Sequence, residues 1–207
     1  PAAAAETTRR LGDMAVGSTV KINVSGTAAN FVILQQGSPS TAIYGNNSNG
    51  TWVLGTSSNA TVRDLRGCAF EGSPYTIRGS NIGSALDGIY AKMDAGIQNS
   101  VREINLPEDR GTTTVPEKVF ILSINELGLY SRTMTYYSSE GVTLDIFSGG
   151  ADRLSYNGLT RSFANYNYDH NIVYVSGGGV RWMDNVSSNS HSFPLAMVLE
   201  PDLRVSA

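Results

Sequence analysis

Helical periodicity occurs in one central region of this chain, and strand-like segments lie before and after it. In "GSNIGSALDGIYAKM" (residues 79–93), Ser80 can cap a helix whose apolar face is formed by Ile82, Ala85, Leu86, Ile89, Tyr90 and Met93. Asp94 can cap a second, shorter helix that carries Ile97 and Val101. Two consecutive helices between two groups of strands predict an α+β domain rather than alternating βαβ units.

The strand-like segments differ in how clearly they are bounded. "TVKINV" (residues 19–24) alternates apolar and polar residues, and "FVILQQ" follows it after the turn-rich "SGTAA", so this pair predicts a β-hairpin. "SGGG" (residues 176–179) separates two β-rich runs and predicts a second hairpin turn, because glycine tolerates positive φ. Further strands are predicted at residues 102–106, 118–123, 142–147, 172–175, 180–183 and 195–199.

Composition limits the classes of protein that fit. A length of 207 residues suits one domain with a substantial core, and the single cysteine, Cys68, allows no internal disulfide. Charged residues make up 16% of the chain and the net charge is −3, which does not indicate nucleic-acid binding. No apolar run approaches the roughly 20 residues that cross a bilayer. We therefore expect a soluble protein, made in a cytoplasm, without membrane insertion.

Residues 1–18, "PAAAAETTRRLGDMAVGS", differ from the rest of the chain. They are rich in alanine and poor in aromatic and β-branched residues. Such a segment can be a free terminal tail. Because it has little apolar bulk of its own to bury, we expect instead an N-terminal arm that a neighbouring subunit or partner holds, with the folded domain spanning residues 19–207.

Several segments in order carry a resemblance to a known family. They are "VKINV", "FVILQQGSPSTAIYGNNSNGTWVL", "IQNSVREINLP", "EKVFILSINELGL", "RSFANYNY" and "FPLAMVLEPDLRVS". The chain resembles, over residues 17–206, a large family of prophage and gut-phage proteins with a C-type-lectin-like fold. It departs from the family at "LTRSFAN" (residues 159–165) and "HSFPLA" (residues 191–196), which lack a Trp and an Arg expected to brace the core.

The resemblance implies a non-enzymatic structural protein of the phage virion, as a head-decoration, collar or fibre component that displays a C-type-lectin-like single domain. The virion is then its location, and its partners are other copies of itself and virion proteins, contacted through the arm. The alternative that the resemblance implies is a receptor- or glycan-binding module of a tail or fibre, used in host attachment. Some relatives are diversified by retroelements that enrich Asn, Tyr, Asp, His and Ser at exposed positions.

The candidate ligand-binding residues lie in "NYNYDHN" (residues 165–171) and at one later tryptophan. The tyrosines offer flat amphipathic faces, and the neighbouring polar side chains offer donors and acceptors. The candidates are Asn165, Tyr166, Asn167, Tyr168, Asp169, His170 and Trp182. The same composition fits a polar loop with aromatic packing, so both interpretations stay open.

Metal binding and catalysis are not predicted. Asp169, His170 and His191 have no spacing typical of a metal site, and there is no GxSxG motif. The carboxylates Glu117, Glu126, Asp145 and Asp152 are scattered, are not paired as an acid and a base, and are predicted to be solvated. We expect no enzyme activity and no cofactor.

Overall fold

A computed structural model describes residues 8–63, 76–78, 80–129, 140–149, 154, 156–163, 172–176, 179–182 and 192–206. Its first half contains β1 (Thr8–Arg10), η1 (Leu11–Asp13), β2 (Thr19–Val24), β3 (Thr27–Gln36), α1 (Thr41–Tyr44), η2 (Asn46–Ser48), β4 (Thr51–Gly55), η3 (Ser58–Ala60), β5 (Thr61–Arg63), α2 (Asn81–Tyr90) and α3 (Ala95–Ser100). The second half contains β6 (Val101–Arg102), β7 (Ile104–Glu108), η4 (Asp109–Gly111), β8 (Thr113–Glu117), β9 (Val119–Phe120), η6 (Asp145–Phe147), β10 (Gly158–Phe163), β11 (Ile172–Ser176), β12 (Gly179–Trp182), β13 (Ser192–Pro194), β14 (Ala196–Leu199) and β15 (Arg204–Ser206).

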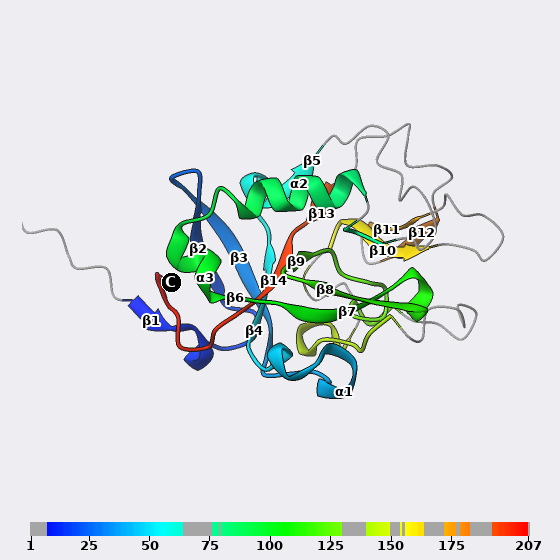
Figure 1. The fold of residues 1–207 in the computed structure, drawn as a ribbon, viewed down its shortest axis with the longest axis horizontal. Coiled ribbons are helices and arrows are strands. Elements are labelled where there is room, and N and C mark those ends of the chain that lie inside the picture. The colour runs from blue at the N-terminus through cyan, green and yellow to red at the C-terminus, as the bar shows by residue number, and fades with distance from the viewer. Residues whose placement is uncertain are drawn as a thin grey trace, which may run out of the picture.

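The largest sheet is antiparallel and curls into a half-barrel (Figure 1). Its strand order is β1-β15-β2-β3-β4-β14-β6, and β9 also pairs with β14. Three smaller sheets are formed by β10-β11-β12, by β13 with β5, and by β7 with β8. The described part of the chain is therefore mainly β with a few short helices, which agrees with the predicted α+β class at this coarse level.

The inner face of the large sheet forms the hydrophobic core around Trp52. The Trp52 ring meets Tyr44 and Phe120 edge to face, with centroid distances of 4.9 and 5.7 Å. Its indole N–H donates to the Ser48 carbonyl at 3.0 Å, so burial leaves no unpaired indole donor. This packing brings α1 and β9 onto β4.

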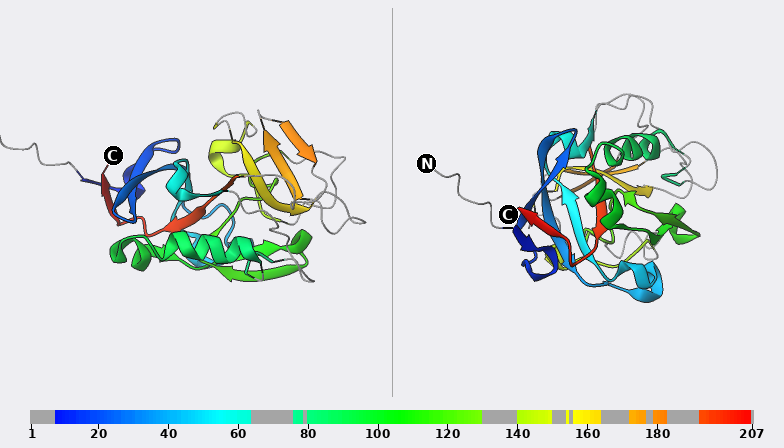
Figure 2. Two further views of the ribbon diagram at one scale, coloured as in Figure 1. Left: turned by 90° about the horizontal axis from the view of Figure 1, so that it is seen from above. Right: turned by 60° about the vertical axis from the view of Figure 1, so that its left-hand side comes forward.

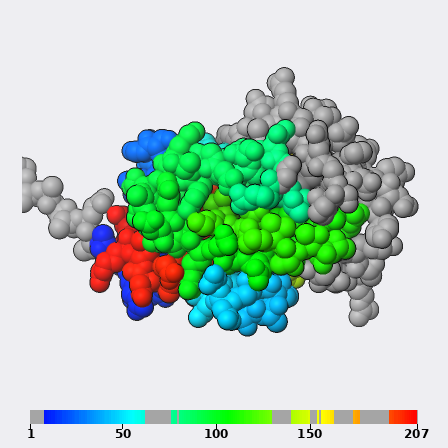
Figure 3. Space-filling view, in the orientation of Figure 1, coloured from blue at the N-terminus to red at the C-terminus, as the bar shows by residue number. Residues whose placement is uncertain are grey.

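Helix α2 begins and packs as its sequence predicts. The Ser80 hydroxyl accepts a hydrogen bond from the Gly83 amide at 3.3 Å, and Ile82 and Leu86 are buried. The α2 and α3 helices, followed by β7 and β8, cover one face of the molecule (Figure 3). In the second helix Asp94 is the N-cap residue, but its carboxylate accepts from the Asn23 side chain instead of capping.

The described part of the expected arm, residues 8–18, lies against the same body as the strands. β1 pairs antiparallel with β15, and Leu11 is fully buried. The Gln36 side chain donates to the carbonyls of Leu11 and Met14 at 3.0 and 2.8 Å. This segment is held by its own chain, because one leucine and several backbone hydrogen bonds compensate for its low apolar content. Residues 1–7 lie outside the described residues.

Other sequence predictions have mixed outcomes. The β2–β3 hairpin is confirmed, and so is the β11–β12 hairpin, in which Ser176 pairs with Gly179. The strand predicted at residues 142–147 is wrong: that segment contains the 3₁₀ turn η6, with Ile146 and Phe147 buried. Apolar and polar residues alternate in this segment, "VTLDIF", as they do in a strand. A single turn can also direct such neighbouring apolar side chains into a core. Among the described helices, none is long and apolar enough to cross a membrane.

Candidate functional site

The β10-β11-β12 sheet lies at the end of the molecule opposite β1 and β15 (Figures 1 and 2). Residues 164–171 connect β10 to β11, which pair antiparallel. The candidates Asn165, Tyr166, Asn167, Tyr168, Asp169 and His170 therefore belong to this connection, and they lie outside the described residues. The backbone of Trp182 lies in β12 opposite Val173, while its side chain is outside the description. Their role as a ligand-binding face stays a prediction.

The described scaffold beneath this connection is centred on Arg161 of β10. Its guanidinium is almost fully buried and forms a two-pronged ion pair with Glu126, with N–O distances of 2.6 and 2.7 Å. The remaining hydrogen bonds go to the carbonyls of Pro107, Ile121 and Glu140, at 3.1, 2.8 and 2.8 Å. Every N–H direction of the guanidinium fork is used, which is the condition under which a buried arginine is tolerated.

Glu126 connects this arginine to α1 at the other side of the core. Its carboxylate accepts from the Tyr44 hydroxyl at 2.8 Å and from the Ser123 amide at 2.9 Å. The Tyr44 oxygen accepts in turn from the Val142 amide at 3.1 Å. Burial, followed by the Glu126 charge, raises the pKa of Tyr44 well above its ordinary value, so the phenol stays a donor.

Glu140 provides a second buried carboxylate beside Arg161. It accepts hydrogen bonds from the Ser162 hydroxyl and, at 2.8 Å, from the Arg110 amide in η4. Its own carbonyl accepts from the Ser123 hydroxyl at 2.8 Å. Burial raises its pKa from 4.5 to about 7. Glu140 thus joins β10 to the η4 turn, where Asp109 and Arg110 both have positive φ.

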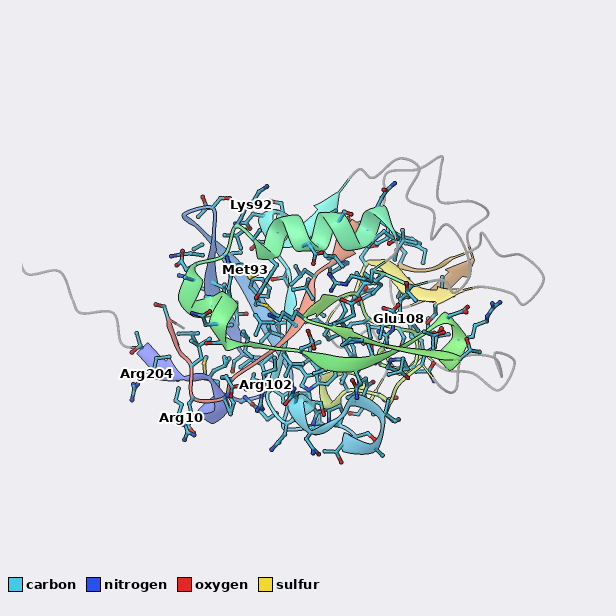
Figure 4. All side chains as sticks on the ribbon, in the orientation of Figure 1. Arg10, Lys92, Met93, Arg102, Glu108 and Arg204 are labelled. Carbon is cyan, nitrogen blue, oxygen red and sulfur yellow. The ribbon has the colours of Figure 1, made fainter. Side chains whose placement is uncertain are left out.

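Glu108, at the end of β7, is the third buried carboxylate. One of its oxygens accepts from the Ile77 amide at 2.9 Å, and the other has no hydrogen-bond partner among the described residues. Burial raises its pKa from 4.5 to about 7 as well. Figure 4 shows Glu108 at the β10 end of the molecule, far from Arg10 and Arg204 at the terminal end.

We name Tyr44, Glu108, Glu126, Glu140, Arg161 and Ser162 the Arg161 cluster. Its residues come from α1, β7, β10 and the segments between strands, so it holds together parts of the chain that are distant in sequence. All six side chains are buried, which excludes direct contact with a large ligand. The cluster therefore fixes β10 to the core.

The prediction that the scattered carboxylates are solvated is wrong for Glu117 and Glu126. Both are fully buried, and each is paired with an arginine, Arg78 and Arg161 respectively. Asp145 is exposed as predicted, and Asp152 lies outside the described residues. Sequence reasoning missed Arg161 as a core residue. The one available signal was its position inside "GLTRSF", a strand whose other residues are uncharged.

A surface pocket lies beside the β10-β11-β12 sheet and has a volume of about 320 Å³. It is formed by the end of β4, by β5 and β13, and by the segment before β10; its described lining is Leu54, Gly55, Thr56, Thr61, Leu154, Tyr156, Asn157, Ser192 and Pro194. Hydroxyl and amide groups thus stand next to apolar side chains, a mixture suited to a small polar ligand. Among the described residues, no group of three or more His, Cys, Asp or Glu side chains is placed to hold a metal ion.

Comparison with known proteins adds no relative. No family model, no curated protein and no solved structure matches the chain significantly.

The cluster predicts that Gly141 cannot be replaced. Its φ is +119°, and a Cβ atom there would overlap the Tyr44 hydroxyl and lie 2.9 Å from a Glu126 carboxylate oxygen. We expect Gly141→Ala to lower the free energy of unfolding by about 3 kcal/mol, since it adds backbone strain and breaks a buried hydrogen bond. Chemical denaturation measures this loss.

Gly88→Ala is the matched control, because Gly88 lies in α2 and a Cβ atom added there would have nothing within 4 Å. This substitution should raise stability by about 0.5–1 kcal/mol. A Gly141→Ala protein as stable as the wild type would show that the Tyr44–Glu126 contact is not needed.

Proposed function

We propose that the chain is a non-enzymatic structural protein of a phage particle, a head-decoration, collar or fibre component that displays a C-type-lectin-like domain. The observation that carries this proposal is the two-ended shape of the molecule. The N-terminal strand and the C-terminal strand pair at one end, and the β10-β11-β12 sheet lies at the other (Figures 1 and 2). Such a molecule can be attached at one end and display the other.

The terminal end has the features of an attachment site. β1 is an edge strand, its residues are exposed, and no described strand pairs with its outer edge. An open edge accepts a further strand from another chain through backbone hydrogen bonds. Residues 1–7 precede this strand directly, so the N-terminal arm and the edge of β1 together form the proposed contact with virion proteins or with other copies of the chain. Repetition in a particle favours symmetric contacts.

We base the proposed lectin-like fold on the order of the elements. Two helices, α2 and α3, follow one another between groups of antiparallel strands, in the order on which the resemblance rests. The segment "LTRSFAN" (residues 159–165), where the chain departs from the family, overlaps β10, in which Arg161 binds to the core. We infer that this arginine compensates for the bracing residues that the chain lacks.

A receptor- or glycan-binding role is the second candidate, and the anchoring of β10 favours it. Thr160, Arg161 and Ser162 are buried and hydrogen-bonded immediately before the connection that carries Asn165 to His170. Binding residues are commonly found on loops that a rigid scaffold positions. The Tyr and Asn side chains of this connection have the chemistry for stacking and hydrogen bonding with sugars or protein surfaces.

The anchoring proposal predicts different results for two N-terminal deletions. Removal of residues 1–7 should leave the domain folded, because β1 and Leu11 are kept, but should reduce incorporation into particles at least tenfold. Removal of residues 1–18 should also destabilise the domain, since it deletes the β1–β15 pairing and the buried Leu11. Circular dichroism separates folding from incorporation, which is measured by protein analysis of purified particles. Normal incorporation of the chain without residues 1–7 would contradict the anchoring role of the arm.

The binding proposal predicts that the combined change Tyr166→Ala and Tyr168→Ala reduces adsorption to host cells at least tenfold without changing thermal stability. The matched control is Tyr90→Phe, which removes a hydroxyl that donates to the Gln98 carbonyl, in a helix away from β10. Adsorption is measured as the fraction of particles bound over time. Wild-type adsorption by particles that contain the double variant would rule out these tyrosines as a contact face.

A further inference from the structure

The Arg161 cluster contains more buried negative groups than positive ones. Glu108, Glu126 and Glu140 are all buried, and the guanidinium of Arg161 is the buried cation among them. It pairs in two-pronged geometry with Glu126, so its charge is largely balanced by that one carboxylate. If Glu108 and Glu140 were both ionised, the cluster would hold two further negative charges, and no described side chain would provide a second buried cation for them. Such charges are very costly, and binding a proton removes the cost.

The other charged and titratable groups that the structure describes around Glu108 and Glu140 do not reverse this imbalance. The η4 turn contributes Arg110, whose side chain is paired with Asp109, and its amide rather than its guanidinium donates to Glu140. β8 contributes Glu117, which is paired with Arg78 from the segment before α2. α1 contributes the phenol of Tyr44, and the segment before β10 contributes that of Tyr156; burial raises the pKa of both phenols, so neither supplies a charge.

The hydrogen bonds of Glu108 and Glu140 also indicate that these carboxylates lack the partners that an ionised group needs. One oxygen of Glu108 is buried and has no hydrogen-bond partner in the described part of the chain, whereas an ionised carboxylate needs donors at both oxygens. Glu140 receives one neutral hydroxyl and one backbone amide, which are weaker partners than a cation. Burial raises the pKa of each of these two carboxylates to about 7, which agrees with the geometry.

We propose that Glu108 and Glu140 form a proton-binding site that couples pH to the attachment of β10. With protons bound, β10 is held to η4 and to the core. With the protons lost, the two buried charges repel each other and Glu126, and the hold on β10 weakens. Because β10 leads directly into the connection at residues 164–171, this site regulates the scaffold of the candidate binding face. The proton site itself does not depend on whether that face binds a ligand.

The sign of the effect follows from linkage between proton binding and folding. The folded-state pKa values lie above the ordinary value of 4.5, so the stabilisation is complete below pH 4.5 and is lost as the pH rises towards and through 7. For one such group the unfolding equilibrium constant should rise about seventyfold between pH 5 and pH 8. Groups that are equally ionised in the folded and unfolded states do not change the unfolding equilibrium constant with pH.

The test is urea unfolding of the full chain at pH 5, 6, 7 and 8, in the wild type, Glu140→Gln, Glu108→Gln and the control Glu103→Gln. Gln keeps the shape and the acceptor but cannot ionise. Glu103 is exposed, and its replacement should leave the pH slope unchanged. In each of the two cluster variants, we expect the rise of the unfolding equilibrium constant between pH 5 and pH 8 to be about seventyfold smaller than in the wild type. If the unfolding equilibrium constant depended on pH equally in all four proteins, the proposal would be overturned.

Hydrogen exchange of the wild type provides a readout that does not require a variant to fold. After correction for the intrinsic dependence on pH, amides of residues 121–124 and 158–163 should lose protection between pH 6 and pH 8, more than those of the β2–β3 hairpin. These segments are joined by the hydrogen bond from the Arg161 amide to the Leu122 carbonyl. Equal changes in the two regions would show that the proton site does not act on β10.

Discussion

The β10 end of the molecule depends on the ion pair between Arg161 and Glu126. It lies in the interior, where an unpaired charge is not tolerated, so each partner must remain within hydrogen-bonding distance of the other. Through Glu126 the pair reaches Tyr44 on α1, and through the contacts of the Arg161 guanidinium with carbonyl groups it reaches β7 and the segment after β9. Because the partners are 35 positions apart in the chain, the pair requires the tertiary fold rather than a local turn.

The two ends of the molecule are stabilised by different kinds of interaction. The terminal end is built by backbone pairing of β1, β15 and β2, with the exposed ion pair between Arg10 and Asp202 contributing little. The β10 end depends instead on buried polar groups that all need partners at once. Networks of this kind are stable when complete and sensitive to the loss of one member. A scaffold of this type is suited to hold β10 in a constant position, and the proposed proton site makes that hold responsive to pH.

Local features of the fold were predictable from sequence, because their causes are local. The Ser80 cap and the apolar face of α2 follow from helical spacing, and the β2–β3 and β11–β12 hairpins follow from alternation and turn residues. Residues 142–147 misled this reasoning, since alternating apolar residues also fit a turn that packs on the core. The Arg161 cluster could not be predicted. Charged residues are normally exposed, and their burial here depends on pairing across the fold, which no spacing reveals. The candidate ligand residues at 165–170 lie outside the described residues, so the composition argument for them stands unaltered.

A double-mutant cycle on Arg161 and Glu126 tests the central role of the ion pair most directly. Arg161→Met leaves a buried carboxylate without its cation, Glu126→Gln leaves a buried guanidinium without its anion, and the combination leaves neither. By urea unfolding, each single change should cost about 3–5 kcal/mol, and the double variant should be at least about 2 kcal/mol more stable than the sum of the two losses predicts. Additive losses, or single losses below about 1 kcal/mol, would contradict the dependence of the β10 end on this pair.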